Sequence, residues 1–183
     1  GADTGDEFVE IRNTTASPIT LNNVYYVAVE GDDVTATAGS ADRVIDLTGQ
    51  TIPANGILVI KSSLSTLNFG SATVFNTAAF DADAIENGSN TNMLVFSGTP
   101  IAQGTDYDAT NDGVLDAATA LGTATVLDSV GYTEGETGEL TYGPRIPRFA
   151  NITPSSISRF AANSTASSAG AWFGGVLVSA LPL

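Results

Sequence analysis

The chain has 183 residues with no Cys and no His, and its twenty Asp and Glu against six Lys and Arg give a net charge of −14. This charge repels the phosphates of nucleic acids and of anionic membranes, so we expect neither as a partner. Without His or Cys the chain offers no Ser-His-Asp triad, no thiolate and no histidine-bound zinc. We therefore expect a protein that is not an enzyme.

Length and composition predict one folded domain over residues 1–183. A typical domain has roughly 100–200 residues, and 43% of this chain is hydrophobic, which is enough for an ordinary core. No apolar stretch reaches the ~20 residues of a membrane-spanning helix. The polar residues are mostly Thr, Ser, Asn and Asp, as in extracellular β-proteins, and the first residue is Gly. We expect a mature, secreted form whose signal peptide has been removed.

The chain order predicts a series of short strands. In residues 6–21, Val9 and Ile11 alternate with Glu10 and Arg12, a pattern typical of a strand with one wet face; only Phe8 departs from it. Residues 57–61 follow an Asn-Gly turn and are nearly all apolar, so we expect a central strand. Further strands are predicted at residues 24–30, 43–47, 73–75, 92–96, 125–132, 156–160 and 172–178. Residues 161–170 are expected to form a loop, and the one helical candidate is a turn or two at 116–121. This pattern favours an all-β sandwich.

Five stretches then resemble, in the right order, the lamin tail domain family. They are EFVEIRN at 7–13, PITLNNV at 18–24, IPANGILVI at 52–60, VLDSVGY at 126–132, and SISR at 156–159 with Trp172. The resemblance implies an immunoglobulin-like β-sandwich. It also implies a bacterial, secreted or surface-exposed module that is often joined to hydrolases and has no catalytic role of its own.

The chain departs from that family in two places. The family usually has a strand before the opening stretch, and only residues 1–6 precede it here. We expect either that this strand is missing or that the edge near residues 6–13 is open, which predicts self-association by strand pairing. Val24 stands where a Trp is common, so Tyr25 or Tyr26 is expected to fill that part of the core.

A long acidic loop, about residues 98–124, carries a candidate calcium site. Calcium prefers oxygens from alternating acidic residues around a Gly turn. The predicted ligands are the side chains of Asp108, Thr110, Asp112 and Asp116 and the carbonyl of Val114.

This ligand series has two defects. Thr110 is a weak ligand at the third position, and Thr119 stands where a bidentate Glu would close the loop. The alternative is a solvated acidic loop whose Asn-Asp-Gly sequence makes a turn. A second acidic group, Asp81, Asp83 and Glu86, lacks the Gly spacing.

Three further side chains are interpreted structurally. Asp128 and Arg159 lie on two predicted strands, and we expect a bidentate ion pair between them rather than two solvated charges. Trp172 is expected in the core with its N–H bonded. The alternative is that Trp172, Phe173, Tyr132, Tyr142 and Tyr107 form a sugar-stacking face. The single lysine, Lys61, is expected to be a solvated residue at a strand end.

These observations predict a non-enzymatic extracellular module for protein interaction or tethering, whose partner is a protein or a cell-surface glycan. The alternative is a calcium-dependent carbohydrate-binding or adhesion module. A hydrolase would have to work with carboxylates alone, and no pair among the twenty acids is marked as acid and nucleophile.

Overall fold

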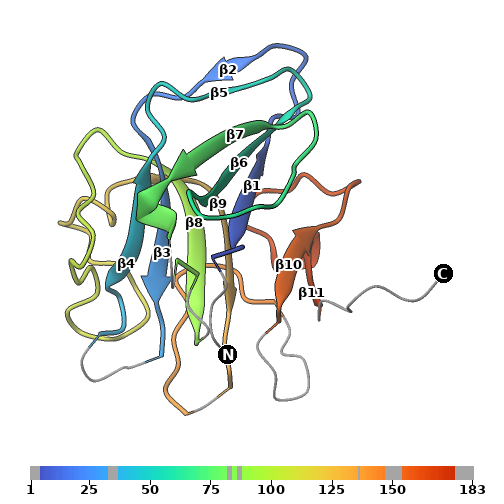
Figure 1. The fold of residues 1–183 in the computed structure, drawn as a ribbon. Coiled ribbons are helices and arrows are strands. Elements are labelled where there is room, and N and C mark those ends of the chain that lie inside the picture. The colour runs from blue at the N-terminus through green and yellow to red at the C-terminus, as the bar shows by residue number, and fades with distance from the viewer. Residues whose placement is uncertain are drawn as a thin grey trace.

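The computed structural model describes residues 5–32, 37–81, 84–85, 88–135, 137–146 and 154–175. These residues form eleven strands and two three-residue 3-10 helices. Two larger sheets make opposing layers, with two short two-stranded sheets beside them (Figure 1). The predicted all-β sandwich is therefore confirmed.

The first layer is a four-stranded antiparallel sheet in the order β4-β3-β8-β9. Its strands are β3 (Val24–Glu30), β4 (Ala41–Asp46), β8 (Asn90–Phe96) and β9 (Thr125–Tyr132). All seven residues of β3 are buried. Alternate side chains of β3 pack into two different apolar clusters, one on each face of the sheet. Burial on both faces explains why this strand is almost continuously apolar.

The second layer is the three-stranded sheet β1-β6-β7, made by β1 (Phe8–Arg12), β6 (Ile57–Ser62) and β7 (Thr73–Thr77). β6 is central, as predicted, and pairs antiparallel with β1 but parallel with β7. The parallel pair requires a long connection, residues 63–72. Phe69 from this connection packs edge-on against Phe8, with ring centroids 4.8 Å apart. This contact explains why Phe8 lies on the outer face with Glu10 and Arg12.

The remaining elements are small. β2 (Ile19–Thr20) pairs with β5 (Thr51–Ile52), and β10 (Ser156–Arg159) pairs with β11 (Trp172–Gly175). Residues 176–178 of the last predicted strand lie outside the described residues. The 3-10 helices are η1 (Ala78–Phe80) and η2 (Ala169–Ala171). Neither of these helices, nor any other helix of the described chain, is long and apolar enough to cross a membrane.

The predicted helical turn at residues 116–121 is wrong, because this segment forms turns without a helix. The side chain of Thr119 competes with helical hydrogen bonding. Its hydroxyl donates to the Asp116 carbonyl at 2.7 Å and accepts the Gly122 N–H at 3.0 Å. Thr side chains that bond to nearby backbone groups favour turns over helices in this way.

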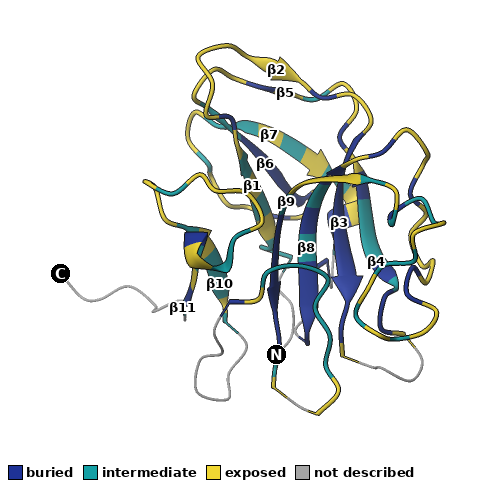
Figure 2. Cartoon of the chain, turned by 180° about the vertical axis from the view of Figure 1, so that it is seen from behind, coloured by how far each residue is buried: buried dark blue, intermediate teal, exposed yellow. Residues whose placement is uncertain are grey.

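The main core lies between the two layers, where Tyr26 is 2% exposed and packs edge-on against Phe80. Tyr26 thus fills the space expected for it, while Tyr25 faces the other cluster. That second cluster lies on the opposite face of the four-stranded sheet, under the acidic loop (Figure 2). Tyr107 and Leu121 of the loop are buried in it. The loop is therefore packed onto the sheet.

The two sheets differ in how their edges are covered. Next to β4, Ala41 N–H donates to the Thr105 carbonyl, and Gly104 N–H donates to the Ala41 carbonyl. Next to β9, Gly131 exchanges backbone hydrogen bonds with residues 144 and 146. Within the described residues, β1 and β7 pair with β6 and with no other strand. In the part of the chain that the structure describes, both edge strands of the four-stranded sheet receive further backbone hydrogen bonds, and the edges of the three-stranded sheet are unpaired.

Candidate functional site

The acidic loop is organised around Asp108, whose side chain is fully buried. One carboxylate oxygen accepts the Asp112 N–H at 3.2 Å and the Thr110 hydroxyl at 3.3 Å. The other accepts the Gly113 N–H at 2.9 Å and the Tyr142 hydroxyl at 3.0 Å. Gly113 has a φ of +82°, which favours Gly and lets the loop curl back on the carboxylate. Four donors thus satisfy this buried charge.

The hydrogen bonds and burial fix the protonation states of Asp108 and Tyr142. Burial raises the pKa of Asp108, but the Gly113 and Asp112 N–H groups and the Tyr142 hydroxyl outweigh burial and hold it below its usual value. The pKa of Tyr142 is raised, first by burial and then by its hydrogen bond to Asp108. Asp108 is therefore a carboxylate and Tyr142 a neutral donor at physiological pH.

The other predicted calcium ligands are also engaged within the loop. Asp112 accepts the Val114 N–H at 2.9 Å, and Asp116 accepts the Ala109 N–H at 3.1 Å. The Thr110 hydroxyl donates to Asp108. Among the described residues, the acidic group whose oxygens all come within 4.8 Å of one another is elsewhere, at Asp32, Glu134 and Glu139. Calcium binding by residues 108–116 stays a prediction, and the loop's own hydrogen bonds already shape it.

Of the second acidic group, only Asp81 lies within the described residues; Asp83 and Glu86 are outside them. Asp81 accepts the Ser62 hydroxyl at 2.7 Å and both the N–H and the hydroxyl of Ser63, at 2.6 and 2.9 Å. The hydrogen bonds from Ser62 and Ser63 lower the pKa of Asp81. Asp81 therefore caps the turn that follows β6.

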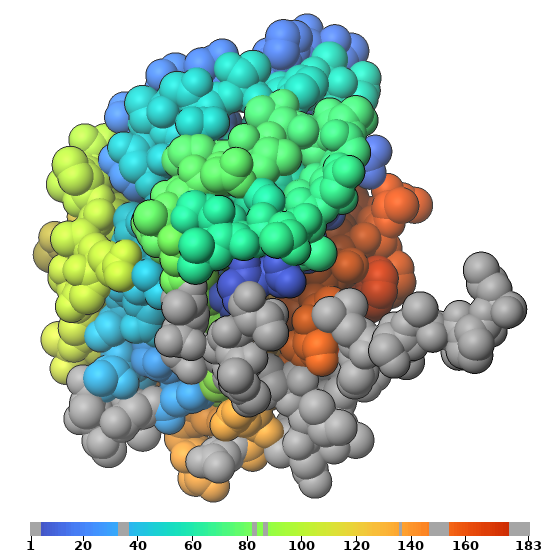
Figure 3. Space-filling model, viewed as in Figure 1, coloured from blue at the N-terminus to red at the C-terminus, as the bar shows by residue number. Residues whose placement is uncertain are grey.

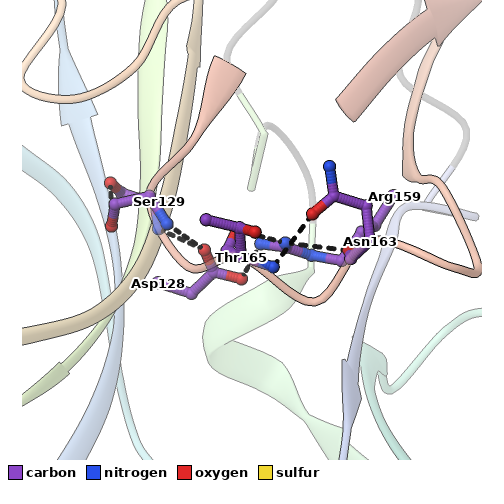
Figure 4. A network of polar contacts seen from close by, with 6 residues as sticks. Asp128, Ser129, Arg159, Asn163 and Thr165 are labelled. Atoms are coloured by element: carbon purple, nitrogen blue, oxygen red, sulfur yellow. Dashed lines mark hydrogen bonds and ion pairs between the residues drawn. The ribbon is translucent and has the colours of Figure 1, made fainter. Parts of the chain in front are cut away.

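The predicted Asp128–Arg159 ion pair is present and joins β9 to the β10–β11 hairpin (Figure 4). The pair is not bidentate, because the second guanidinium nitrogen donates to the Thr165 carbonyl at 2.7 Å. Asp128 also accepts the Ser167 N–H at 2.9 Å. The guanidinium lies 4.3 Å from the ring centroid of Trp172. This network fastens the hairpin and its loop to the sheet.

Trp172 packs as predicted, but its N–H does not bond as predicted. The ring is half-buried against the small cluster of Val130, Tyr132 and Ile146. Its indole nitrogen is buried and has no hydrogen-bond partner in the described structure. Tyr132 and Tyr107 are 4% and 3% exposed, so the proposed set of sugar-stacking rings does not share a surface.

The expectation of a solvated Lys61 is wrong. The side chain is 9% exposed, and its ammonium donates to the Ser65 carbonyl at 2.7 Å and the Leu67 carbonyl at 3.3 Å. The connection between β6 and β7 folds over the strand end and supplies these carbonyls. Strand pattern alone does not reveal such a connection.

Sequence reasoning missed a cleft on the outer face of the three-stranded sheet. Its volume is about 410 Å³, and Glu10, Pro53, Asn55, Ile57, Phe69 and Ser71 are among its lining residues. The Asn55-Gly56 turn is readable from the sequence and forms one wall. The opposite wall, Phe69, depends on the path of residues 63–72, for which the sequence carries no signal.

A buried acid was also missed. Glu30, at the end of β3, is 9% exposed and accepts the Gly31 and Asp32 N–H groups at 2.7 and 2.6 Å. Burial is the main cause that raises the pKa of Glu30 to about 7, and Asp42 and Asp32 add to it. An acid that ends a wholly apolar strand is the sequence signal that could have found it.

Comparisons with known proteins do not assign this chain to a family. A search of protein-family models finds none that matches this chain, and a search of curated proteins finds no match either.

Proposed function

We propose that this chain is a non-enzymatic extracellular binding module, an immunoglobulin-like sandwich of lamin tail type. The order of the five family-like stretches along the sequence supports the type. The observation that carries the binding function is the cleft beside β1. The partner is a protein segment or a cell-surface glycan.

The cleft has the size and chemistry of a recognition site. Ligand sites usually measure roughly 300–1,000 Å³ and combine apolar walls with a few polar groups. Here the apolar part is Phe69, Ile57 and Pro53, and the polar part is the Glu10 carboxylate and the Asn55 amide. Glu10 and Asn55 are both exposed, so a partner can reach them.

The backbone of β1 adds a second means of recognition. Asn13 N–H donates to the Gly56 carbonyl at 2.9 Å, continuing the β1–β6 ladder. In an antiparallel pair, residues whose backbone N–H and C=O groups bond to the partner strand alternate with residues whose backbone groups point away from it. Glu10 and Arg12 therefore direct their N–H and C=O groups away from β6, toward an incoming strand.

Binding to a panel of immobilised glycans and extended peptides tests this proposal. Phe69→Ala removes the aromatic wall of the cleft, and Glu10→Gln removes its negative charge. Each is expected to weaken binding about 10-fold, as loss of an interface anchor does. Phe160→Ala is the control, because this exposed ring follows β10 and does not line the cleft. Equal binding by the cleft variants and the wild type would contradict the proposal.

The edge of β1 is unpaired among the described residues, which supports self-association as one mode of interaction. Sedimentation at rising concentration should show a dimer. Glu10→Pro removes an outward N–H without touching the ladder to β6 and should restore the monomer, whereas Glu10→Ala should not. A strict monomer at high concentration would exclude this mode.

The alternative is a calcium-dependent carbohydrate-binding or adhesion module. The curled loop favours it, because the N–H groups of Asp112 and Gly113 already turn toward Asp108 at the first ligand position. Glycan binding that disappears with chelator would support this alternative, and binding unaffected by chelator would exclude it.

A further inference from the structure

The outer face of β1 carries two opposite charges that its own sheet does not neutralise. Glu10 and Arg12 are both exposed. Directly across the ladder, Glu10 stands opposite Val59 of β6 and Arg12 stands opposite Ile57, and both of these neighbours are apolar. Within the described part of the chain, neither charged side chain makes an ion pair or a hydrogen bond. Both charges can therefore be contacted by another molecule.

The backbone and the inner face of β1 also suit a further strand. Glu10 and Arg12 direct their N–H and C=O groups away from β6, and no strand among the described residues pairs with them. On the inner face, Val9 and Ile11 pack against the main core but are only partly buried. A strand added along this edge would bond to the backbone groups and cover the two apolar side chains, as in recognition by strand addition.

The sequence of β1 complements itself when a second copy lies antiparallel to the first. The residues whose backbone groups point at the partner then stand opposite one another. A two-fold axis at Glu10 would place Glu10 opposite Glu10, and like charges directly opposite are destabilising. An axis at Val9 would place Phe8 opposite Glu10 and form no ion pair. An axis at Ile11 places Glu10 of each copy opposite Arg12 of the other, so that unlike charges meet in both places.

We infer that a second copy of this chain binds along β1 in the register centred on Ile11. Each Glu10–Arg12 pair then exchanges two backbone hydrogen bonds in addition to its side-chain contact. The two Ile11 side chains meet on the inner face, at the kind of position where opposite side chains lie closest. The three-stranded sheets of both copies become one continuous sheet. This inference rests on the self-association in the proposed function and specifies its register.

The overall charge sets the conditions under which this pairing can be measured. Two chains of net charge −14 repel one another at long range. At an ionic strength of about 0.15 M the Debye length is about 8 Å, so most of this repulsion is screened. The contacts between Glu10 and Arg12 lie within that distance and keep more of their attraction.

Charge reversal tests the register by sedimentation of the full chain at this ionic strength. Glu10→Arg places two positive charges opposite each other at both contacts, and Arg12→Glu places two negative charges there. Each variant should raise the dissociation constant of the dimer about 10-fold, although the two change the net charge in opposite directions. Mixing the two variants should restore the wild-type affinity in a heterodimer. The double variant Glu10→Arg/Arg12→Glu should restore it in a homodimer, because unlike charges meet again.

Arg145→Glu is the matched control. It makes the same change of charge as Arg12→Glu at an exposed residue beside β9, so it should leave the dimer intact. Recovery on mixing excludes misfolding as the cause of the loss, because two misfolded variants would not restore one another.

Two sets of results overturn the inference. Dimers of equal affinity in the wild type and both single variants, or no recovery in the mixture and the double variant, would refute the register and leave self-association standing. A wild-type chain that stays monomeric would refute both. Neither result bears on the cleft, whose binding is measured separately with glycans and peptides.

Discussion

Replacement of Asp108 by Asn is the sharpest test of how the acidic loop is held. Asp108→Asn keeps the shape of the side chain but removes its charge and turns one acceptor oxygen into a donor. If that position faces the Gly113 N–H and the Tyr142 hydroxyl, two hydrogen bonds to a charged group are lost. Each such bond contributes about 1.5–3 kcal/mol. Tyr142 can rotate its hydroxyl to recover part of the loss, so we expect a destabilisation of about 3 kcal/mol.

Urea and thermal unfolding in chelator measure this loss without any contribution from calcium. For a chain of this length, about 3 kcal/mol corresponds to a fall of roughly 6–12 °C in melting temperature. A double-mutant cycle with Tyr142→Phe should give a coupling energy of about 0.5–3 kcal/mol, because the two groups are in direct contact. Asp112→Asn is the control. Its carboxylate accepts one N–H at the surface, so we expect a loss below about 1 kcal/mol.

A loss below about 1 kcal/mol for Asp108→Asn, or a coupling energy near zero, would refute this reasoning. Either result would mean that the Asp108 hydrogen bonds do not decide the conformation of the loop.

Three other perturbations have defined outcomes. Arg159→Leu removes an ion pair that is 22% and 29% exposed, so it should cost about 1 kcal/mol and speed amide exchange in β10 and β11; unchanged melting and exchange would argue against an anchoring role. Millimolar calcium should stabilise the chelator-stripped protein, by about 2.7 kcal/mol at a hundredfold excess over the dissociation constant. If Asp112→Ala reduces this stabilisation by calcium, the lost part comes from binding at the 108–116 loop. If the variant and the wild type are stabilised equally, the loop is a turn that binds no calcium. Hydrogen bonds lower the pKa of Asp81, so its contribution is complete above about pH 4 and is lost as the pH falls through the lowered pKa. Asp81→Asn should therefore flatten the melting temperature against pH in this acid range, and parallel curves would contradict the role of the cap.

The strands were predictable where burial follows from local pattern. β3 and β9 have the predicted bounds, and the alternation in residues 9–12 correctly gave the two faces of β1. The Asp128–Arg159 pair could be anticipated because both residues lie on recognisable strands. In each case the information lies within a few consecutive residues.

Features that depend on chain path were not predictable. The two-residue strands β2 and β5 pair across 31 or more positions and have no periodicity of their own. Lys61 is buried because a connection folds over it, and its own neighbours in sequence do not reveal that. Glu134 and Asp32 converge although about a hundred residues separate them, since topology alone brings their strand ends together. The spacing of acidic residues along the sequence pointed only to the loop at residues 108–116, whose acids are close neighbours in the chain.

The space-filling view shows the β10–β11 hairpin at the side of the molecule (Figure 3). Within the placed residues this hairpin shares no ladder with either layer, and it is fastened by the Asp128 network and the small Trp172 cluster. A force applied to β11 therefore acts on the Asp128 network and the Trp172 cluster before it acts on any strand of the four-stranded sheet. Under tension the hairpin can peel away first and lengthen the chain while the sandwich stays folded. If the proposed tethering function is correct, this segment would extend under tension before the sandwich unfolds.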